Sequence, residues 1–245
     1  MPSRTLVIGI PLPHSTFDNY SFASAPTLSE YTRLIVDISA VSRVVEDLVR
    51  NLAEHKTFAG QPIANGPTTA AAFGLADLLA MRRREAVQFF TRGGNALCIA
   101  YPDVVHEGIS GIAEWRCYDW LPKPDKFRYD TDLLPGFGKT PAQVSEEAHP
   151  FAPYLAMYGS RMAYRVHAAE SSAAAHAMRS FGISSGGVSV AFDVNVGNGR
   201  IVFVPPLSHP QQDRIAVAGT LFESFVRYEV DRGGESPDSI SKEGP

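Results

Sequence analysis

Short apolar runs alternate with amphipathic segments along the first hundred residues. Three of these runs, residues 5–10 (TLVIGI), 33–38 (RLIVDI) and 96–101 (ALCIAY), are dominated by aliphatic residues. Runs of this length and composition are typical of strands that are buried on both faces. Because buried strands that alternate with helices pair in parallel, this part of the chain predicts an α/β sheet with helices on both faces.

Three segments have the spacing of amphipathic helices. The first follows the second run, the second extends to about Arg92, and the third covers roughly residues 211–230. In the second helix we expect Arg82, Arg83 and Arg84 to form a solvated face, and Gly93-Gly94 to end the helix in the left-handed conformation. The apolar positions that define the three helices are Val44, Val45, Leu48 and Leu52; Leu75, Leu78, Leu79, Val87 and Phe90; and Ile215, Val217, Leu221, Phe222, Phe225 and Val226.

The second half of the chain has a different pattern. Residues 161–167 alternate polar and apolar side chains, which predicts a half-exposed strand. Residues 188–196 and 200–204 are β-rich and flank Gly197-Asn198-Gly199, which predicts a β-hairpin. Residues 115–141 are rich in proline, aromatic residues and aspartate, so we expect a long ordered loop or insertion with little regular structure.

These elements predict one α/β domain over residues 1–230, followed by a disordered polar tail over residues 231–245. The expected fold has a mostly parallel sheet with helices on both faces, the long loop and the late hairpin. The stretch between the first two strands, residues 14–30, is polar and aromatic and is not expected to hold a regular helix.

Composition narrows the function without naming it. The chain has 245 residues, a formal net charge of −4 and 20% charged residues, which does not favour nucleic-acid binding. No apolar stretch approaches the ~18 residues of a membrane span, so no membrane association is expected. Two cysteines without a CxxC pair predict a reducing cytoplasmic location, without a disulfide framework or a cysteine zinc site. We expect neither a cofactor nor a metal.

The order of helix, Gly93-Gly94, apolar strand and turn at Tyr101-Pro102 resembles the class I glutamine amidotransferase-like superfamily. The late stretch GVSVAFDVNVGNGRIVFVPP also resembles the closing hairpin of such domains. The resemblance covers roughly residues 5–103 and 186–206, and many α/β proteins share these motifs. It implies a flavodoxin-like sheet and raises the question of a catalytic cysteine.

The enzymes of that superfamily place a cysteine on a strained turn between a strand and a helix, where its thiolate is stabilised. Ala96 and Ala100 flank Cys98 at the small-residue positions of such a turn. However, a strand of ~5–6 residues counted from Gly94 puts the turn at Ala100 or Tyr101. None of the seven histidines starts the His-x-Glu pair of these enzymes. The resemblance therefore implies a degenerate member, with Cys98 as an inert thiol in the middle of a strand.

Polar residues follow several of the expected strands, and they are the alternative candidates for catalysis. Ligands of open α/β sheets bind at the carboxyl ends of the strands. His14, Asp37, Asp103 and His106 are therefore the candidate acid/base residues. His209, which follows the late hairpin, is a candidate binding residue. Asp37 and Ser39 could instead simply cap the following helix.

The long loop holds the candidate binding residues Tyr118, Trp120 and Pro122. Their cluster is expected to be buried against the sheet or to lie at an interface with a protein partner or a second copy. We expect a non-enzymatic domain that acts as a binding, sensing or scaffold component of a larger cytoplasmic system. The alternatives are a hydrolase that uses an Asp/His cluster at the sheet edge, and a nucleic-acid-linked defence component.

Overall fold

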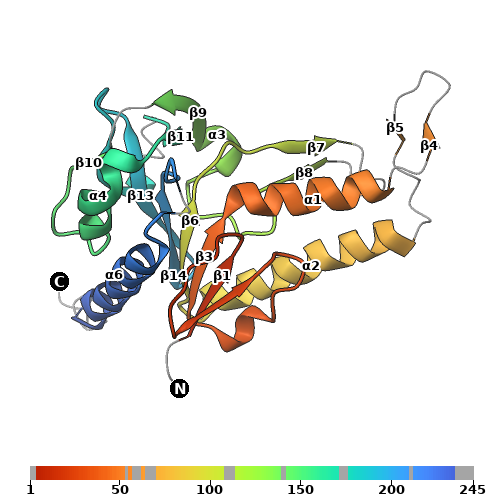
Figure 1. The fold of residues 1–245 in the computed structure, drawn as a ribbon, viewed down its shortest axis with the longest axis horizontal. Coiled ribbons are helices and arrows are strands. Elements are labelled where there is room, and N and C mark those ends of the chain that lie inside the picture. The colour runs from red at the N-terminus through yellow and green to blue at the C-terminus, as the bar shows by residue number, and fades with distance from the viewer. Residues whose placement is uncertain are drawn as a thin grey trace, which may run out of the picture.

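An eight-stranded sheet forms the centre of the computed structural model, which describes residues 4–52, 55–56, 62–63, 70–107, 114–138, 142–170, 176–209 and 212–234 (Figure 1). The strand order is β10-β12-β13-β14-β6-β3-β1-β2. The strands are β1 (Thr5–Ile8), β2 (Phe17–Tyr20), β3 (Arg33–Asp37), β6 (Asn95–Ile99), β10 (Gln143–Val144), β12 (Met178–Ile183), β13 (Ser189–Val196) and β14 (Gly199–Val204).

The parallel part of the sheet has the flavodoxin-like order. Strands β2, β1, β3, β6 and β14 lie side by side and all pair in parallel. Counted along the chain, these five strands have the spatial order 2-1-3-4-5. The remaining strands, β13, β12 and β10, extend the β14 side by antiparallel pairing. The expected flavodoxin-like α/β fold with a mostly parallel sheet is confirmed.

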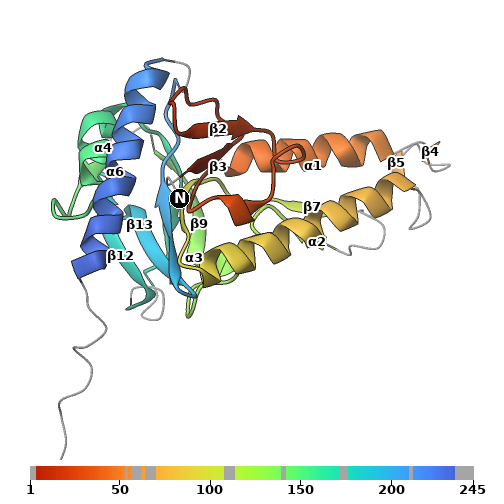
Figure 2. The ribbon, with the colours of Figure 1, turned by 90° about the horizontal axis from the view of Figure 1, so that it is seen from below.

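Helices cover both faces of the sheet, and the side-chain alternation of the strands separates two cores. Helices α1 (Ile38–Leu52) and α2 (Ala70–Thr91) lie on one face, and α4 (Ala152–Tyr158) and α6 (Arg214–Gly234) lie on the other (Figure 2). Along β3, Leu34 and Val36 pack in the core of the α1–α2 face, whereas Ile35 packs in the core of the α4–α6 face. All three side chains are fully buried, as a strand covered on both faces requires.

Two predicted turns are confirmed by backbone conformation. Gly93 has φ +84° and is the left-handed residue that ends α2. Gly197 has φ +56° at the tip of the hairpin between β13 and β14. In the hairpin, Phe192 pairs with Phe203 and Val196 pairs with Gly199. The hairpin thus joins the antiparallel part of the sheet to the parallel part.

The segment between the first two buried strands was expected to lack a helix, and it contains the edge strand β2. Thr5 pairs with Phe17 on one side and with Arg33 on the other. The sequence of β2, FDNY, is mostly polar because the strand lies at the edge of the sheet and only Phe17 is buried. A short 3-10 helix, η1 (Leu28–Glu30), follows it.

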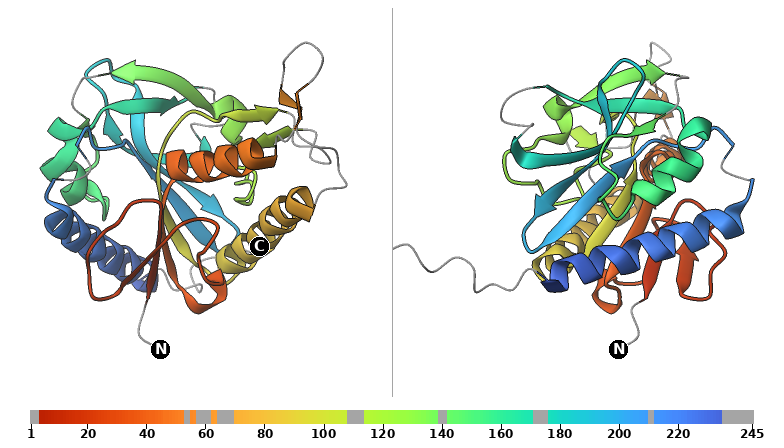
Figure 3. Two further views of the ribbon diagram at one scale, coloured as in Figure 1. Left: turned by 45° about the vertical axis from the view of Figure 1, so that its right-hand side comes forward. Right: turned by 90° about the vertical axis from the view of Figure 1, so that its left-hand side faces the viewer.

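The long loop contains more regular structure than the sequence predicted. It includes β8 (Glu114–Arg116), a short helix α3 (Tyr129–Asp132) and β9 (Leu133–Gly138). The predicted half-exposed strand is β11 (Tyr164–Ala168), which pairs with β9 and not with the main sheet. Figure 3 shows this pair outside the main sheet, at the end far from the N-terminus. The pairing depends on residues that are about thirty positions apart, so local sequence patterns did not reveal it.

Four further short elements lie outside the main sheet. β7 (Val105–Glu107) pairs with β8, and β4 (His55–Lys56) pairs with β5 (Pro62–Ile63). A 3-10 turn, η2 (Gly159–Arg161), follows α4. The predicted tail begins inside α6, which extends to Gly234, and residues 235–245 lie outside the described residues. No helix in the described part of the chain has the length and apolar character needed to cross a membrane.

Arg82 corrects the prediction of a solvated arginine face on α2. Its side chain is 2% exposed, whereas Arg83 and Arg84 are exposed. Arg82 forms an ion pair of 2.8 Å with Glu85 and donates hydrogen bonds to the carbonyl oxygens of Pro26 (3.0 Å) and Ala25. The loop before η1 covers this turn of the helix, and a helical pattern alone could not reveal that contact.

Candidate functional site

Two cavities lie at the carboxyl ends of the parallel strands. The inner cavity has a volume of about 30 Å³ and is surrounded by the ends of β1, β3, β6 and β14 and by α4 and α6. The outer groove has a volume of about 220 Å³ and lies along the first turns of α1. Tyr101 lines both cavities. In a sheet of order 2-1-3-4-5 this edge is where ligands bind, so it is the candidate functional site.

Asp37 is the last residue of β3, and it lines the inner cavity. Its Oδ1 accepts hydrogen bonds from the backbone amide of Ser39 (2.9 Å) and from the hydroxyl of Ser39 (2.7 Å). These bonds satisfy an amide in the first turn of α1, which otherwise has no partner in the helix. Asp37 thus caps α1, which is one of the two roles that the sequence allowed for it; the other was catalysis.

Ala100 and Tyr101 form the start of the turn after β6, which is where the sequence predicted the turn. The hydroxyl of Tyr118 donates to the carbonyl oxygen of Tyr101 (2.7 Å) and accepts from its amide (3.2 Å). Among the described residues, only Lys126 and Asp213 combine a side chain with a positive φ. The turn therefore has neither the strained residue nor the free backbone amide that a nucleophile elbow uses to bind an oxyanion.

Charges of both signs surround the Tyr101 hydroxyl. Partial burial and the negative charge of Asp37 raise its pKa above the ordinary value, although contact with Ser39 and the positive charges of Arg165 and Arg43 oppose the rise. The phenol is therefore neutral at physiological pH. It can donate or accept a hydrogen bond, but it cannot serve as a phenolate nucleophile there.

Asp103 lies two residues after Tyr101 and belongs to a small polar cluster. Its Oδ1 accepts a hydrogen bond from the thiol of Cys117 (3.3 Å), and its Oδ2 accepts one from Arg116 (3.4 Å). Burial raises the pKa of the Asp103 carboxyl, while the contacts with Cys117 and Arg116 act in the opposite direction. Both partners come from the start of the long loop, so Asp103 anchors this loop to the sheet edge.

Cys98 lies in the middle of β6, as the sequence predicted. It pairs with Val36 of β3 and Phe203 of β14, and its side chain is fully buried. Burial raises the pKa of its thiol far above the ordinary value. Burial and the charge of Asp103 do the same for Cys117. Neither cysteine is thus in the environment that generates a thiolate.

We expect both cysteines of the folded protein to resist alkylation at neutral pH. Iodoacetamide should label Cys98 and Cys117 more than about tenfold more slowly than it labels a free thiol, because only the exposed thiolate reacts. Both should react fully in denaturant. Mass spectrometry of peptides from quenched time points measures the two rates. Rapid labelling of Cys98 in the native protein would show that the strand opens or that the thiol is activated.

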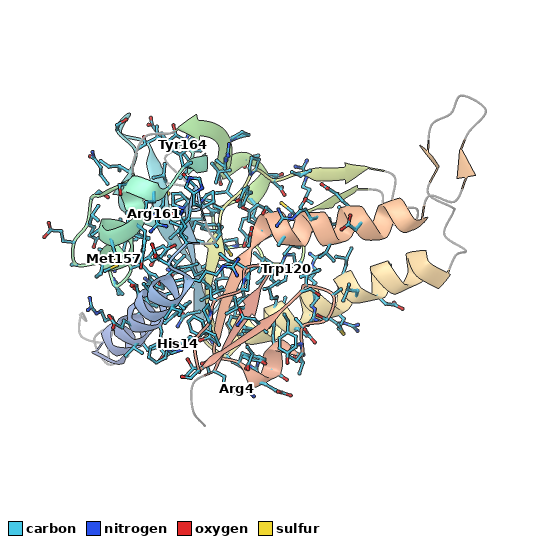
Figure 4. The ribbon with its side chains drawn as sticks, viewed as in Figure 1. Arg4, His14, Trp120, Met157, Arg161 and Tyr164 are labelled. Carbon is cyan, nitrogen blue, oxygen red and sulfur yellow. The ribbon has the colours of Figure 1, made fainter. Side chains whose placement is uncertain are left out.

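The structure separates the residues that the sequence grouped at the sheet edge. His14 lies at the amino-end edge of the sheet, because the amide of Thr5 donates to the carbonyl oxygen of Thr16 and the amide of Phe17 donates to that of His14 (Figure 4). Its Nδ1 is 2.8 Å from the hydroxyl of Thr16, and its ring stacks on Phe222 of α6 at 4.6 Å. The chain runs back after β1 in order to start β2 parallel to it, so His14 ends at the opposite edge from Asp37. The predicted grouping of His14 with the aspartates is wrong.

The other two candidate histidines follow β6 and β14 along the chain. His106 belongs to β7, in register with Trp115 of β8, and this hairpin extends alongside α1 (Figure 1). His209 is exposed in the turn after β14. In the described part of the chain, no three His, Cys, Asp or Glu side chains are grouped in a way that could hold a metal ion.

Tyr118 and Trp120 are core residues of the domain, each 1% exposed. Tyr118 stacks on Tyr129 at 5.1 Å, and Trp120 contacts the ring of Phe22 at 5.2 Å. The loop thus packs its own aromatic residues against the sheet, so a partner cannot reach these two residues. Pro122 is half-buried, and its carbonyl oxygen accepts a hydrogen bond from Tyr129 (2.7 Å).

A second polar cluster, which the sequence analysis did not find, is buried under α6. Asp193 of β13 is 3% exposed, and its Oδ2 accepts hydrogen bonds from Tyr228 (2.8 Å), His149 (3.3 Å) and Arg200 (3.3 Å). The Nδ1 of His149 accepts from the amide of Phe151, so Nε2 carries the proton that is donated to Asp193. In the sequence, the aspartate that interrupts the apolar run VAFDVNV could have indicated this buried polar cluster.

Comparison with known proteins does not name a family. No protein-family model and no curated protein matches the chain. Among solved structures, the chain is similar to a cytoplasmic protein from Salmonella typhimurium (11% identity, 89% of this chain and 98% of the other, TM-score 0.42). It is also similar to a putative GMP synthase subunit from Thermoplasma acidophilum (10%, 95% and 99%, 0.38). A third similarity is to a β-galactosidase from Bacillus circulans sp. alkalophilus (12%, 93% and 31%, 0.40).

Proposed function

We propose that this chain is a non-catalytic, glutamine amidotransferase-like domain that binds a small molecule and acts as a binding or sensing component of a larger cytoplasmic system. The observation that carries the proposal is the turn after β6. Ala100 and Tyr101 stand where the resemblance implies a nucleophile, and the Tyr118 hydroxyl occupies both backbone groups of Tyr101. The site keeps the position of an active site in this fold but lacks the groups for acyl transfer.

The cysteines support the same conclusion. Both thiols are buried, with pKa values raised by burial, so neither provides a substitute nucleophile for the missing elbow residue. The cavities remain beside the turn, and they are lined mainly by apolar side chains with a few polar groups. This composition is typical of sites that bind small molecules.

The hydrolase alternative loses its main support. It required histidines next to Asp37 and Asp103, but His14 lies at the opposite edge of the sheet, where its ring contacts Phe17 and Phe222. Asp37 caps a helix and Asp103 anchors a loop. We therefore do not favour an Asp/His reaction at this edge.

The proposal is tested with tagged protein that is purified gently from its own host. Native mass spectrometry is expected to show the 26.6 kDa chain together with a bound small molecule or a second protein in fixed ratio. A bare monomer would contradict a role as an assembly component. In parallel, the protein is incubated with the small-molecule fraction of the host lysate. No metabolite should change relative to a sample with heat-denatured protein, and turnover of any metabolite would contradict the non-catalytic role.

A further inference from the structure

We infer that the inner cavity and the outer groove form one binding site for a small uncharged aromatic molecule with one hydrogen-bond donor, and that the Tyr101 side chain is the gate between them. This inference rests on the proposed binding function and names its ligand class. It is carried by the position of Tyr101, by the chemistry of the inner cavity and by the balance of charges in the groove.

The inner cavity is apolar but contains two polar groups that an occupant could use. Its walls include Ile10, Leu12, Ile99, Leu207, Val217 and Leu221. Tyr154 also lines it, is only 2% exposed, and forms no hydrogen bond with any described residue through its hydroxyl. Asp37 adds a carboxylate that accepts hydrogen bonds. An occupant with an apolar body and one polar hydrogen can pack against the apolar walls and donate a hydrogen bond to this carboxylate.

In the closed form, the inner cavity is too small for such an occupant. A volume of about 30 Å³ holds roughly two water molecules. Tyr101 is half-buried and packs against the hydrophobic cores on both sides of the sheet. If its ring turns outward, the space of one aromatic ring is added and the cavity joins the groove of about 220 Å³. The size of the occupant is therefore close to one aromatic ring.

Only the side chain of Tyr101 has to move for the gate to open. The Tyr118 hydroxyl holds the backbone at both polar groups, so the turn itself stays in place. The Tyr101 hydroxyl meets Ser39 and the charges of Asp37, Arg43 and Arg165, and these contacts favour the closed position without enclosing the ring fully. The gate is thus a rotamer change on a fixed backbone.

The charges in the outer groove favour an uncharged ligand. Arg43 and Glu46 line the groove from neighbouring turns of α1, one of each sign. The other polar groups there are the hydroxyls of Ser39 and Ser42. These two opposite charges largely cancel, so the groove attracts neither anions nor cations strongly.

Phenol is the probe, since it has one ring and one hydroxyl. Its binding to the full chain is measured by titration, monitored by amide chemical shifts. Tyr101→Ala should bind phenol at least about tenfold more tightly than the wild type, because affinity is reduced by the fraction of molecules in which the gate is open. Tyr101→Phe keeps the ring that closes the gate and loses only the hydroxyl contacts, so as the matched control it should strengthen binding less than Tyr101→Ala does.

Two further measurements place the probe in the inner cavity. Val217→Phe should weaken phenol binding to Tyr101→Ala at least about tenfold, and Val217→Ile is the milder variant if the phenylalanine does not fold. Toluene, which has no hydroxyl, should bind about tenfold more weakly than phenol. The inference is overturned if Tyr101→Ala shows no saturable binding, or if filling the cavity at Val217 leaves the affinity unchanged. Either result leaves the non-catalytic role intact, because turnover and native mass test that role separately.

Discussion

Asp193→Asn is expected to lower the free energy of unfolding by about 3 kcal/mol at neutral pH. The carboxylate accepts three hydrogen bonds inside the protein, and two of its donors, His149 and Tyr228, are almost fully buried. An asparagine has the same shape but removes the negative charge that faces Arg200. The donors around it then lose a charged acceptor without gaining contact with water.

The effect of Asp193→Asn should depend on pH. Burial alone would raise the pKa of Asp193, but the hydrogen bonds from His149 and Tyr228 and the charge of Arg200 lower it below the ordinary value. The stabilisation is therefore complete above the unfolded-state pKa of about 3.9 and is lost as the pH falls through the folded-state pKa. The unfolding free energies of the wild type and the variant should converge in acid.

Urea denaturation at several pH values between neutral and acid measures this convergence. Asp213→Asn is the matched control, because Asp213 forms an exposed ion pair with Arg161 at 2.8 Å and its positive φ is tolerated by asparagine. This control should change stability by less than about 1 kcal/mol. An equal loss in both variants, or a gap for Asp193→Asn that persists at low pH, would contradict the role assigned to the buried carboxylate. The nearby pair of Glu146 and Arg179 stays intact in both variants.

Arg82→Met is expected to lower the free energy of unfolding by roughly 3 kcal/mol. Methionine preserves the length and the apolar part of the side chain but removes the guanidinium. Glu85, which is 14% exposed, then loses its partner, and the carbonyl oxygens of Ala25 and Pro26 lose their donor. The loop before η1 should detach from α2 as a consequence.

Chemical denaturation of Arg82→Met and of Arg83→Met provides the comparison. Arg83 is one residue away on the exposed side of the same helix, so its replacement should cost less than about 0.5 kcal/mol. Hydrogen exchange should also increase at residues 25–30 in Arg82→Met but not in the control. Equal stability of the two variants would contradict the buried role of Arg82 and would favour the solvated position that the sequence predicted.

Local patterns were sufficient for the central elements of the fold. The apolar runs at β1, β3 and β6, the helical spacing of α1, α2 and α6, and the Gly-Asn-Gly tip between β13 and β14 each follow from residues that are close in the sequence. The inert state of Cys98 was also predicted locally, because the distance from Gly94 leaves it in the middle of a strand. These features depend on periodicity and turn chemistry, which the chain carries along its length.

Pairing between distant residues decided the rest. The edge strand β2 has no apolar pattern of its own, and its direction is what moves His14 away from Asp37. The strand β9 forms only because β11 lies beside it, and Arg82 is buried only because the loop at Ala25 and Pro26 covers it. The fold class and the buried mid-strand position of Cys98 were therefore determined by the sequence itself. The tertiary structure alone decided which polar residues meet, because their contacts join segments whose local patterns are independent of each other.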